Sequence, residues 1–446
     1  MIPEAWRHGE VAVVGLGKSG TAASRWLASH GIAVYASDAA STPWLVETGS
    51  QLRDLGVAVE LGGHDLPRIE RASAVVVSPG VPTDAEPIVA ARAVGVEVVA
   101  ELDLGIRILD GSKVIAVTGT NGKTTTTALI AHVLDSAGVP AAAVGNIGKP
   151  LTALASDPHR PEWIALEASS FQLHDAPHLT PDVGVVTNLA PDHLDRYTDV
   201  AAYYDDKRLL FRNADDSSVW VLNADDPGVL ELAEGAAGTR RYWSLEKPSD
   251  AWYDREGARL VIGKSTLLAR SQLQLLGDHN VANALAAALA SLTTGVPLAA
   301  VARGLETFAA PPHRLETVGT VNGVRWINDS KATNTSAASV ALSAMTQPYV
   351  LVLGGRPKGE QFDVLDPGPH CRAIVVYGEA AGRIAGELSA DVSLDVIEPF
   401  DEAVRRAGEL AHAGDVVLLS PACASYDQFG SFAERGDRFR EIVEGL

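Results

Sequence analysis

The stretch that decides the fold is Val114-Ile115-Ala116-Val117-Thr118-Gly119-Thr120-Asn121-Gly122-Lys123-Thr124-Thr125. Its apolar half predicts a buried strand over Val114–Val117, and the segment through Leu129 and Ile130 predicts a helix. The turn between them combines glycines with a lysine that can neutralise β- and γ-phosphates and a hydroxyl that suits Mg²⁺. A standard phosphate loop has a glycine where this chain has Val117, so the alternative is a chance Gly-Lys-Thr turn. The strand before the turn and the helix after it favour a phosphate site.

A second glycine-rich turn, Gly15–Gly20, follows a predicted strand over Val11–Val14 and opens another helix. Asp38 stands at the end of the next predicted strand, which is the context of a dinucleotide fingerprint. The glycines allow a tight turn, and the N–H groups of the helix can bind a diphosphate. Taken alone, this turn favours nicotinamide-nucleotide binding over a purely structural role. It does not distinguish a dinucleotide from a nucleotide-diphosphate sugar.

Short β-branched runs alternate with Ala-rich helical stretches along nearly the whole chain, which predicts doubly wound α/β domains. We expect three: a Rossmann-like domain over 1–110, a P-loop ATPase-type central domain with a mainly parallel sheet over 111–310, and a Rossmann-like domain over 311–446. Strands are expected at Val11–Val14, Ala33–Ala36, Ala74–Val77, Val114–Val117, Trp163–Leu166, Val183–Val186, Val219–Leu222, Trp326–Ile327, Tyr349–Leu353, Ala373–Tyr377 and Val416–Leu419.

Nearly every polar cluster comes directly after one of these strands. Ligands of open α/β sheets bind outside the carboxyl ends of the strands, so the pattern predicts one cleft shared between domains. Turn formation is the alternative for any single cluster. The clusters are Gly15–Gly20, Ser78–Gly80, Thr118–Thr124, Glu167–Ser170, Asn188–His193, Asn328–Lys331, Gly354–Lys358 and Ser420–Ser425.

Composition excludes several classes of protein. Lys and Arg number 36 against 56 Asp and Glu, a net charge of −20, which argues against binding nucleic acid or an anionic membrane. Two cysteines, Cys371 and Cys423, exclude a disulfide framework and a Cys-rich zinc site.

The first residues lack the pattern of a signal peptide. The uncharged run 281–302 is long enough to span a bilayer, but its Ala content and polar residues favour a buried helix and a turn. We expect a cytoplasmic protein.

Four polar residues allow both a chemical and a structural interpretation. Glu167 suits Mg²⁺ as a hard oxygen ligand, or it belongs to a helix N-cap region. His193, flanked by two aspartates, is a candidate ligand or acid–base group. Lys207, beside two acids on a helix, reads from sequence alone as a solvated lysine. Arg314 is either a linker charge or a group that reaches a transferring phosphate. Cys423, which lacks a partner that would activate it, reads as buried packing.

In order along the chain, these segments resemble the Mur ligase family of bacterial cell-wall synthesis over essentially the whole length. The last domain is most similar to the member that adds D-glutamate, and it lacks the Asp-Asn-Pro-Arg and His-His-Pro-Thr segments of other members. The matching motifs are Thr118–Thr125, Gly145–Gly148, Glu167–Gln172, Asp192–Asp195, Gly277–Asn280, Trp326–Asn334 and Ser420–Phe429.

The resemblance implies roles at matching positions. UDP-substrate contacts would come from Gly17, Lys18, Ser19, Asp38, Ser78 and Gly80, with further substrate contacts from Asn146 and Ser169. The ATP site would comprise Gly119, Thr120, Asn121, Gly122, Lys123, Thr124, Thr125, Asn280, Asn283, Arg314, Asp329 and Lys331. D-Glutamate would meet Thr333, Lys358, Ser425 and Phe432, and Tyr426 would be a further substrate contact. Two Mg²⁺ ions would be held by Thr124, Glu167, His193 and a carbamylated Lys207. The catalytic group would be Lys123, His193, Lys207 and Arg314.

The reaction that the resemblance implies is ATP-dependent amide formation between UDP-N-acetylmuramoyl-L-alanine and D-glutamate through an acyl phosphate. The partners would be these small molecules, without nucleic acid or membrane, and the protein would be a monomer. The alternatives are another Mur-type ligase, folylpolyglutamate synthase, a nucleotide-dependent binding module, and an NAD-dependent oxidoreductase. The second glycine loop argues against the oxidoreductase.

Overall fold

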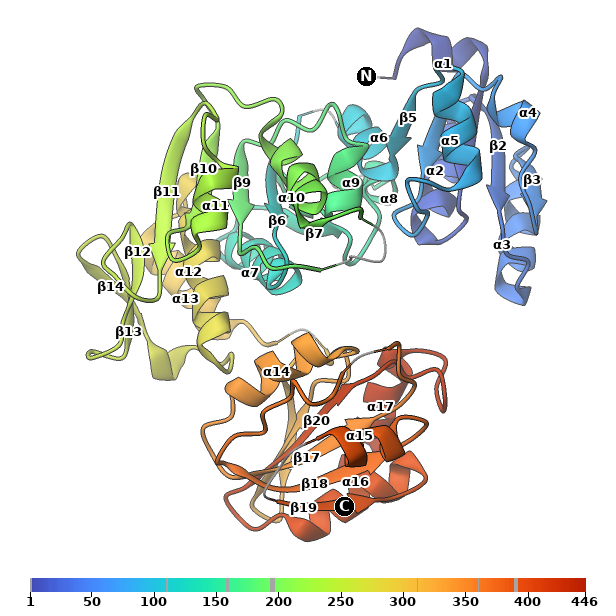
Figure 1. The fold of residues 1–446 in the computed structure, drawn as a ribbon. Coiled ribbons are helices and arrows are strands. Elements are labelled where there is room, and N and C mark those ends of the chain that lie inside the picture. Colours follow the sequence, from blue (N-terminus) through green and yellow to red (C-terminus); the bar gives the residue numbers. More distant parts are fainter. Residues whose placement is uncertain are drawn as a thin grey trace. The chain divides into compact units, whose positions relative to one another are not determined.

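The computed structural model describes residues 2–109, 111–157, 160–192, 197–310, 312–359, 361–388 and 392–446. It is an α/β protein with three sheets (Figure 1). The chain forms two compact units, each described by itself. The first unit runs to Arg270 and includes Ala282–Glu306, and the C-terminal unit comprises Ser271–Val281 and Thr307–Leu446. The expected α/β class and the three sheets are confirmed.

The N-terminal sheet is wholly parallel, with strand order β3-β2-β1-β4-β5. Since β2 and β4 flank β1, the strand order reverses at β1, where open sheets of this kind bind ligands. The strands are β1 Glu10–Val14, β2 Ala33–Asp38, β3 Ala58–Leu61, β4 Ala74–Val77 and β5 Val98–Ala100. The helices are α1 Glu4–His8, α2 Lys18–Ser29, α3 Pro43–Asp54, α4 Leu66–Ile69, α5 Glu86–Ala93 and α6 Glu101–Ile108.

The two faces of this sheet bury different helices. Leu27 of α2 and Leu45 of α3 belong to the cluster that covers one face, with Val11 and Val34. Ile69 of α4 and Ile88 of α5 pack with Ala12 and Val75 on the other face. Helices α2 and α3 therefore lie on the same side and begin at the same carboxyl edge, which right-handed crossovers require.

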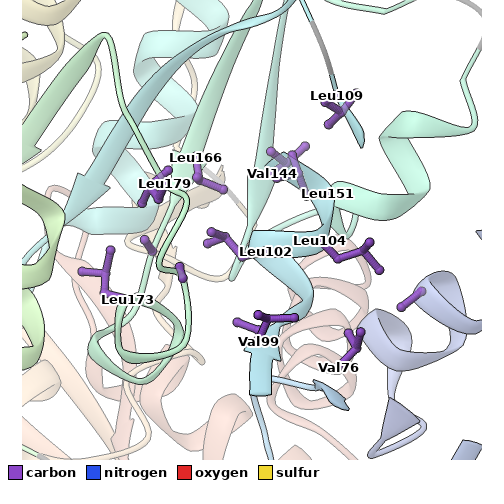
Figure 2. Packing of buried hydrophobic residues seen from close by; sticks show 14 of the residues in the cluster. Val76, Val99, Leu102, Leu104, Leu109, Val144, Leu151, Leu166, Leu173 and Leu179 are labelled. Carbon is purple, nitrogen blue, oxygen red and sulfur yellow. The ribbon is translucent and has the colours of Figure 1, made fainter. Parts of the chain in front are cut away.

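Helix α6 joins the N-terminal sheet to the central sheet. Leu102 and Leu104 lie with Leu151 of α8 in one buried cluster (Figure 2). A Cβ on Gly105 would come within 2.5 Å of Leu151, so the helices approach as only glycine allows. The buried Glu101 carboxylate accepts hydrogen bonds from the Thr152 N–H (2.7 Å) and hydroxyl (2.5 Å). These contacts lie between the last helix of the N-terminal sheet and the first residues of α8.

The central sheet is mostly parallel, with order β14-β13-β12-β11-β10-β9-β6-β8-β7 and an antiparallel end at β12–β14. Strand β6 lies between β8 and β9, so the turn after it sits where the strand order reverses. The strands are β6 Lys113–Thr118, β7 Ala141–Gly145, β8 Trp163–Glu167, β9 Val183–Val186, β10 Val219–Asn223, β11 Thr239–Ser244, β12 Ala251–Asp254, β13 Arg259–Ile262 and β14 Ser265–Ala269. The helices are α7 Lys123–Ser136, α8 Leu151–Ala155, α9 Ser170–His174, α10 Val200–Arg208, η1 Leu209–Phe211, α11 Pro227–Leu232, η2 Arg270–Gln272, α12 Asp278–Thr293 and α13 Leu298–Thr307.

The C-terminal sheet has order β15-β16-β20-β17-β18-β19, with only the β15–β16 pair antiparallel. Apolar clusters cover both of its faces. The strands are β15 Glu316–Val321, β16 Val324–Asn328, β17 Tyr349–Gly354, β18 Cys371–Tyr377, β19 Ser393–Val396 and β20 Val416–Ala422. The helices are α14 Thr335–Ser343, α15 Ala381–Glu387, α16 Phe400–Leu410 and α17 Phe432–Glu444.

All eleven expected strands are present, and the run 281–302 forms the buried helix α12, a turn and the start of α13, as predicted. Cys423 is fully buried, which confirms its packing role. In the part of the chain that the structure describes, no helix is long and apolar enough to cross a membrane.

Candidate active site

The turn after β6 takes its shape from two glycines. Gly119 has φ +138°, and a Cβ there would lie 2.0 Å from the Thr187 hydroxyl. Gly122 has φ +81°, and a Cβ there would lie 2.3 Å from Asn283 Oδ1 on α12. Both positions combine a left-handed backbone with a close approach, so no larger side chain fits. The Gly-Lys-Thr turn is therefore built into the fold.

Side chains from the end of β9 hold this turn. Asn188 and Asn121 form two hydrogen bonds. The Asn121 N–H donates to Asn188 Oδ1 at 2.9 Å, and Asn188 Nδ2 donates to the Asn121 carbonyl at 3.0 Å. The Thr187 hydroxyl donates to the same carbonyl at 2.6 Å. The Thr120 hydroxyl bonds the backbone of Ala190. The turn is thus preorganised on the neighbouring strand, which lowers the cost of ordering it around a ligand.

Two lysine amines converge on one carbonyl oxygen. Lys123 Nζ donates to the carbonyls of Gly119 and Thr120, each at 2.8 Å. Lys207 Nζ, from α10, also donates to Gly119 at 2.8 Å. Thr124 follows Lys123 in the first turn of α7, and Thr125 is buried behind it. The turn therefore places two lysine amines at the carboxyl end of β6, where the Lys123 ammonium and the backbone N–H groups would bind an anionic phosphate.

Lys207 is only 1% exposed, so the interpretation of a solvated lysine is wrong. Burial, together with the Lys123 ammonium, lowers the pKa of Lys207 well below its usual value, while Asp192 and Asp206 oppose that shift. Its amine also lies 4.4 Å from the Tyr203 ring centroid. A buried amine with a lowered pKa has the neutral form that reacts with CO₂.

Asp206 occupies a cluster that the sequence did not indicate. It accepts hydrogen bonds from Tyr197 (2.8 Å) and pairs with His174 (2.7 Å), which raises the pKa of His174. Tyr197 in turn stacks on Phe171 at a centroid distance of 5.2 Å. Phe171 and His174 of α9 and Tyr197, which precedes α10, form no sequence motif, so only the fold brings them together around Asp206.

Glu167, at the end of β8, is 2% exposed. Its Oε1 accepts a hydrogen bond from Asn146 Nδ2 at 3.1 Å, and its Oε2 is buried with no hydrogen-bond partner among the described residues. An unpaired buried carboxylate oxygen is costly, and a bound cation would satisfy it. Ser169 belongs to a helix N-cap: it forms a capping box with Gln172 at the start of α9.

No group of three or more His, Cys, Asp or Glu side chains among the described residues could hold a metal alone. Mg²⁺ is commonly held by one or two carboxylates together with substrate phosphates, so this agrees with a site completed by ATP. His193, the other expected metal ligand, lies outside the residues that the structure describes.

The N-terminal turn is held by a carboxylate and a hydroxyl. Asp38 Oδ2 accepts the Leu16 N–H (2.7 Å), and its Oδ1 accepts the Ala40 N–H (2.9 Å). The Ser78 hydroxyl, after β4, donates to the Gly15 carbonyl at 2.7 Å. Asp38 and Ser78 therefore act on the backbone of the turn. The residues left at the surface are Gly17, Lys18 and Gly80, with Ser19 partly exposed.

In the C-terminal unit, the expected residues fall at the carboxyl ends of β16 and β20. Asp329 accepts hydrogen bonds from the Leu315 N–H (3.2 Å) and the Ser420 hydroxyl (2.9 Å), and burial raises its pKa to about 7. Lys331 Nζ lies 4.9 Å from the Phe432 ring centroid. The structure thus brings together Lys331 and Phe432, which were assigned to different substrates.

The remaining expected residues differ in exposure. Arg314 is partly exposed and close enough to Asp329 to affect its pKa. Asn280 donates to the Leu276 carbonyl in this unit, whereas Asn283 accepts from Thr126 in the first unit. Ser425 is buried, Thr333 partly buried, Lys358 exposed, and Tyr426 63% exposed.

Arg435 of α17 was missed by sequence reasoning. It is fully buried, and its guanidinium donates to Ser330 Oγ (2.9 Å), Ser330 O (2.8 Å) and Cys423 O (3.1 Å), with longer bonds to Gly354 and Ala424. One side chain thereby ties together the loops after β16, β17 and β20. An arginine in a charged helix gives no sequence signal of this role.

Three family models match the chain. The Mur ligase MurD-like N-terminal domain matches residues 9–100, the Mur ligase middle domain matches 117–291, and the Mur ligase glutamate ligase domain matches 313–423. Two curated relatives, both named UDP-N-acetylmuramoylalanine--D-glutamate ligase, are similar over nearly full length. The protein from Pelotomaculum thermopropionicum is 41% identical over 98% of each chain. The one from Gloeobacter violaceus is 42% identical over 98% of this chain and 99% of its own.

Solved structures share the fold. UDP-N-acetylmuramate-alanine ligase MurC from Thermotoga maritima has a TM-score of 0.63 at 22% identity, covering 98% of this chain and all of its own. A pseudomurein peptide ligase type C from Methanothermus fervidus has a TM-score of 0.60 at 20% identity, with 98% and 99% covered. With domain models along its length and relatives about 40% identical from end to end, the chain belongs to the Mur ligase family.

Proposed function

We propose that this protein is an ATP-dependent ligase that adds D-glutamate to UDP-N-acetylmuramoyl-L-alanine in peptidoglycan precursor synthesis. The name of the relatives and the match to a glutamate ligase domain support this substrate pair. The observation that carries the chemistry is the convergence of Lys123 and Lys207 on the Gly119 carbonyl. The Lys123 ammonium suits transfer of a γ-phosphoryl group, and the buried Lys207 amine beside it suits carbamylation.

The reaction has two steps. The terminal carboxylate of the UDP-linked substrate attacks the γ-phosphorus of ATP, which gives an acyl phosphate and ADP. The amine of D-glutamate then attacks the acyl carbon, a tetrahedral intermediate forms, and phosphate leaves as the amide bond forms. The protein supplies positioning and charge: the backbone amides of the turn and Lys123 hold the phosphates, and Arg314 stabilises the transferring group.

Mg²⁺ fits the donors at the carboxyl ends of β6 and β8. The unpaired Glu167 Oε2 and the Thr124 hydroxyl are hard oxygen ligands of the kind that this ion takes. Bound there, the ion would neutralise charge on the phosphates. Lys207, once its neutral amine has added CO₂ and lost a proton, would present a carboxylate to the second ion. His193 is proposed for the same ion on the resemblance alone.

The other assignments stay proposals. The Gly15–Gly20 turn would bind the UDP diphosphate, Thr333, Lys358, Ser425 and Phe432 would bind D-glutamate, and Tyr426 would be a further substrate contact. The division into 1–110, 111–310 and 311–446, a cytoplasmic location and a monomeric state are proposed in the same way.

The test is phosphate release from ATP in the presence of UDP-N-acetylmuramoyl-L-alanine, compared across D-glutamate, L-glutamate, lysine and diaminopimelate. We expect turnover with D-glutamate alone, and mass spectrometry of the product should show one added glutamyl residue. Turnover only with diaminopimelate or lysine would indicate another Mur-type ligase. Turnover only with a pterin substrate would indicate folylpolyglutamate synthase.

A further inference from the structure

Trp44 is an unusual residue to leave in water. Its side chain is 54% exposed in the first turn of α3, although the indole ring has a large apolar area that is usually buried or in an interface. The loop before it, from Ala39 to Thr42, joins the carboxyl end of β2 to this helix and is exposed throughout. Trp44 therefore stands at the same edge of the N-terminal sheet as the Gly15–Gly20 turn.

The flank of α3 that carries Trp44 faces α2. Arg25 Nη2 of α2 donates to Gln51 Oε1 of α3 at 2.5 Å, so these two positions face each other. Trp44 lies seven residues before Gln51, and Lys18 lies seven residues before Arg25. Seven residues are about two helical turns, so each pair lies on one flank of its helix, about 10.5 Å apart along the axis. Because both helices start at the same edge of the sheet, Trp44 and Lys18 stand opposite each other at the mouth of the turn.

The loop next to Trp44 offers a bound base few side-chain hydrogen bonds. Ala39 and Ala40 have no polar side-chain atoms, both Asp38 oxygens already accept backbone N–H groups, and the Thr42 hydroxyl caps α3, which leaves the exposed Ser41 hydroxyl. What this part of the surface offers is one flat, exposed aromatic ring. Aromatic side chains bind nucleobases by stacking, which every base allows because every base has a π-face.

We propose that the Trp44 indole stacks on the uracil base of the UDP-linked substrate while the diphosphate lies at the Gly15–Gly20 turn. This inference rests on the proposed function and adds a binding residue to it. Stacking supplies affinity and leaves base identity to other groups, so Trp44 sets how tightly the nucleotide end is held.

The experiment compares Trp44→Ala, Trp44→Phe and Val46→Ala. Val46 is a matched control: it lies in the same first turn, is 50% exposed and points to the opposite flank of α3. Steady-state kinetics should give the KM for each substrate, and calorimetry should give the Kd for UDP alone. Tryptophan fluorescence during UDP titration provides a third readout.

We expect Trp44→Ala to raise the KM of the UDP-linked substrate and the Kd of UDP about tenfold or more. kcat and the KM values of ATP and D-glutamate should stay within twofold of wild type. Trp44→Phe should keep most of the affinity, because a phenyl ring still stacks, but lose the quenching of fluorescence by UDP. Val46→Ala should behave as wild type.

The inference is overturned if Trp44→Ala binds UDP as tightly as wild type, or if Val46→Ala loses as much affinity. It is also overturned if the main effect of Trp44→Ala is on oligomeric state, since the ring would then cover a second copy. Wild-type protein that binds UDP but does not ligate D-glutamate would refute the proposed function and leave the stacking inference intact.

Discussion

The two glycine-rich turns of the first unit share one local pattern and differ in the side chains that bind their backbone. Each follows a central parallel strand at the point where strand order reverses, and each begins a helix. At the Gly15 turn, the side chains that hold the backbone are an acid and a hydroxyl, Asp38 and Ser78. At the Gly119 turn, two lysines donate to the backbone carbonyls.

The difference separates binding from chemistry. A diphosphate that is only held needs N–H groups and a turn of fixed shape, which the Asp38 carboxylate supplies by fixing the loop. A phosphoryl group that is transferred gains charge on its oxygens in the transition state, and preorganised cations stabilise that state most. At the central turn this cation is the Lys123 ammonium, which is held by the carbonyls of Gly119 and Thr120.

Removing one lysine from each turn should affect catalysis at one turn and binding at the other. Lys123→Ala should lower kcat about 10³-fold, because Lys123 stabilises the transferring phosphoryl group, while the fold stays intact by circular dichroism. Lys18→Ala, the corresponding change at the exposed lysine, should raise only the KM of the UDP-linked substrate, by a few fold. Near-normal ligation by Lys123→Ala would refute the role of the central turn.

The second lysine of the central turn gives the next largest effect. Lys207→Ala should lower kcat about 10²-fold, because it removes the proposed carbamate. Short-chain carboxylic acids, which supply a carboxylate in the vacated space, should restore part of the activity of this variant and none of that of Lys123→Ala. A fully active Lys207→Ala would remove this residue from the site.

The sequence predicts elements that depend on local patterns better than those that depend on contacts between distant residues. Strands such as β6, β9 and β17 are buried on both faces of parallel sheets, so they read as apolar runs and were predicted. The strands β7 and β12–β14 were not predicted, because β7 is mostly alanine, which favours helices, and the apolar runs of β12–β14 are short.

The site shows the same limit. The glycine turns are local patterns with a fixed geometry, so sequence alone located them. The burial of Lys207 was missed because a lysine beside two acids on a helix looks solvated, and only the packing of α10 against the β6 turn reverses this. Arg435 was missed for a similar reason: its partners lie on three other loops.

At the Gly15 turn, the test is the carboxylate that fixes it. Asp38→Asn keeps one acceptor oxygen, so one of the Leu16 and Ala40 N–H groups would face an NH₂ group. We expect unfolding to become easier by about 1 kcal/mol and the KM of the UDP-linked substrate to rise severalfold. The KM of ATP should not change. Equal effects on both KM values would mean that the two turns are not independent.

Lys207 should also make the free energy of unfolding depend on pH, by a small amount. Burial lowers the pKa of Lys207 in the folded protein, so between that lowered value and the ordinary lysine pKa of ~10.4 the unfolded chain binds more protons than the folded one. The free energy of unfolding should therefore rise with pH over this range because of Lys207. In Lys207→Met, thermal unfolding measured at several pH values should show a shallower rise than in wild type, whereas Lys18→Met, at the exposed lysine of the other turn, should follow wild type. If stability rises equally with pH in wild type and in Lys207→Met, the Lys207 amine does not have a lowered pKa in the folded protein.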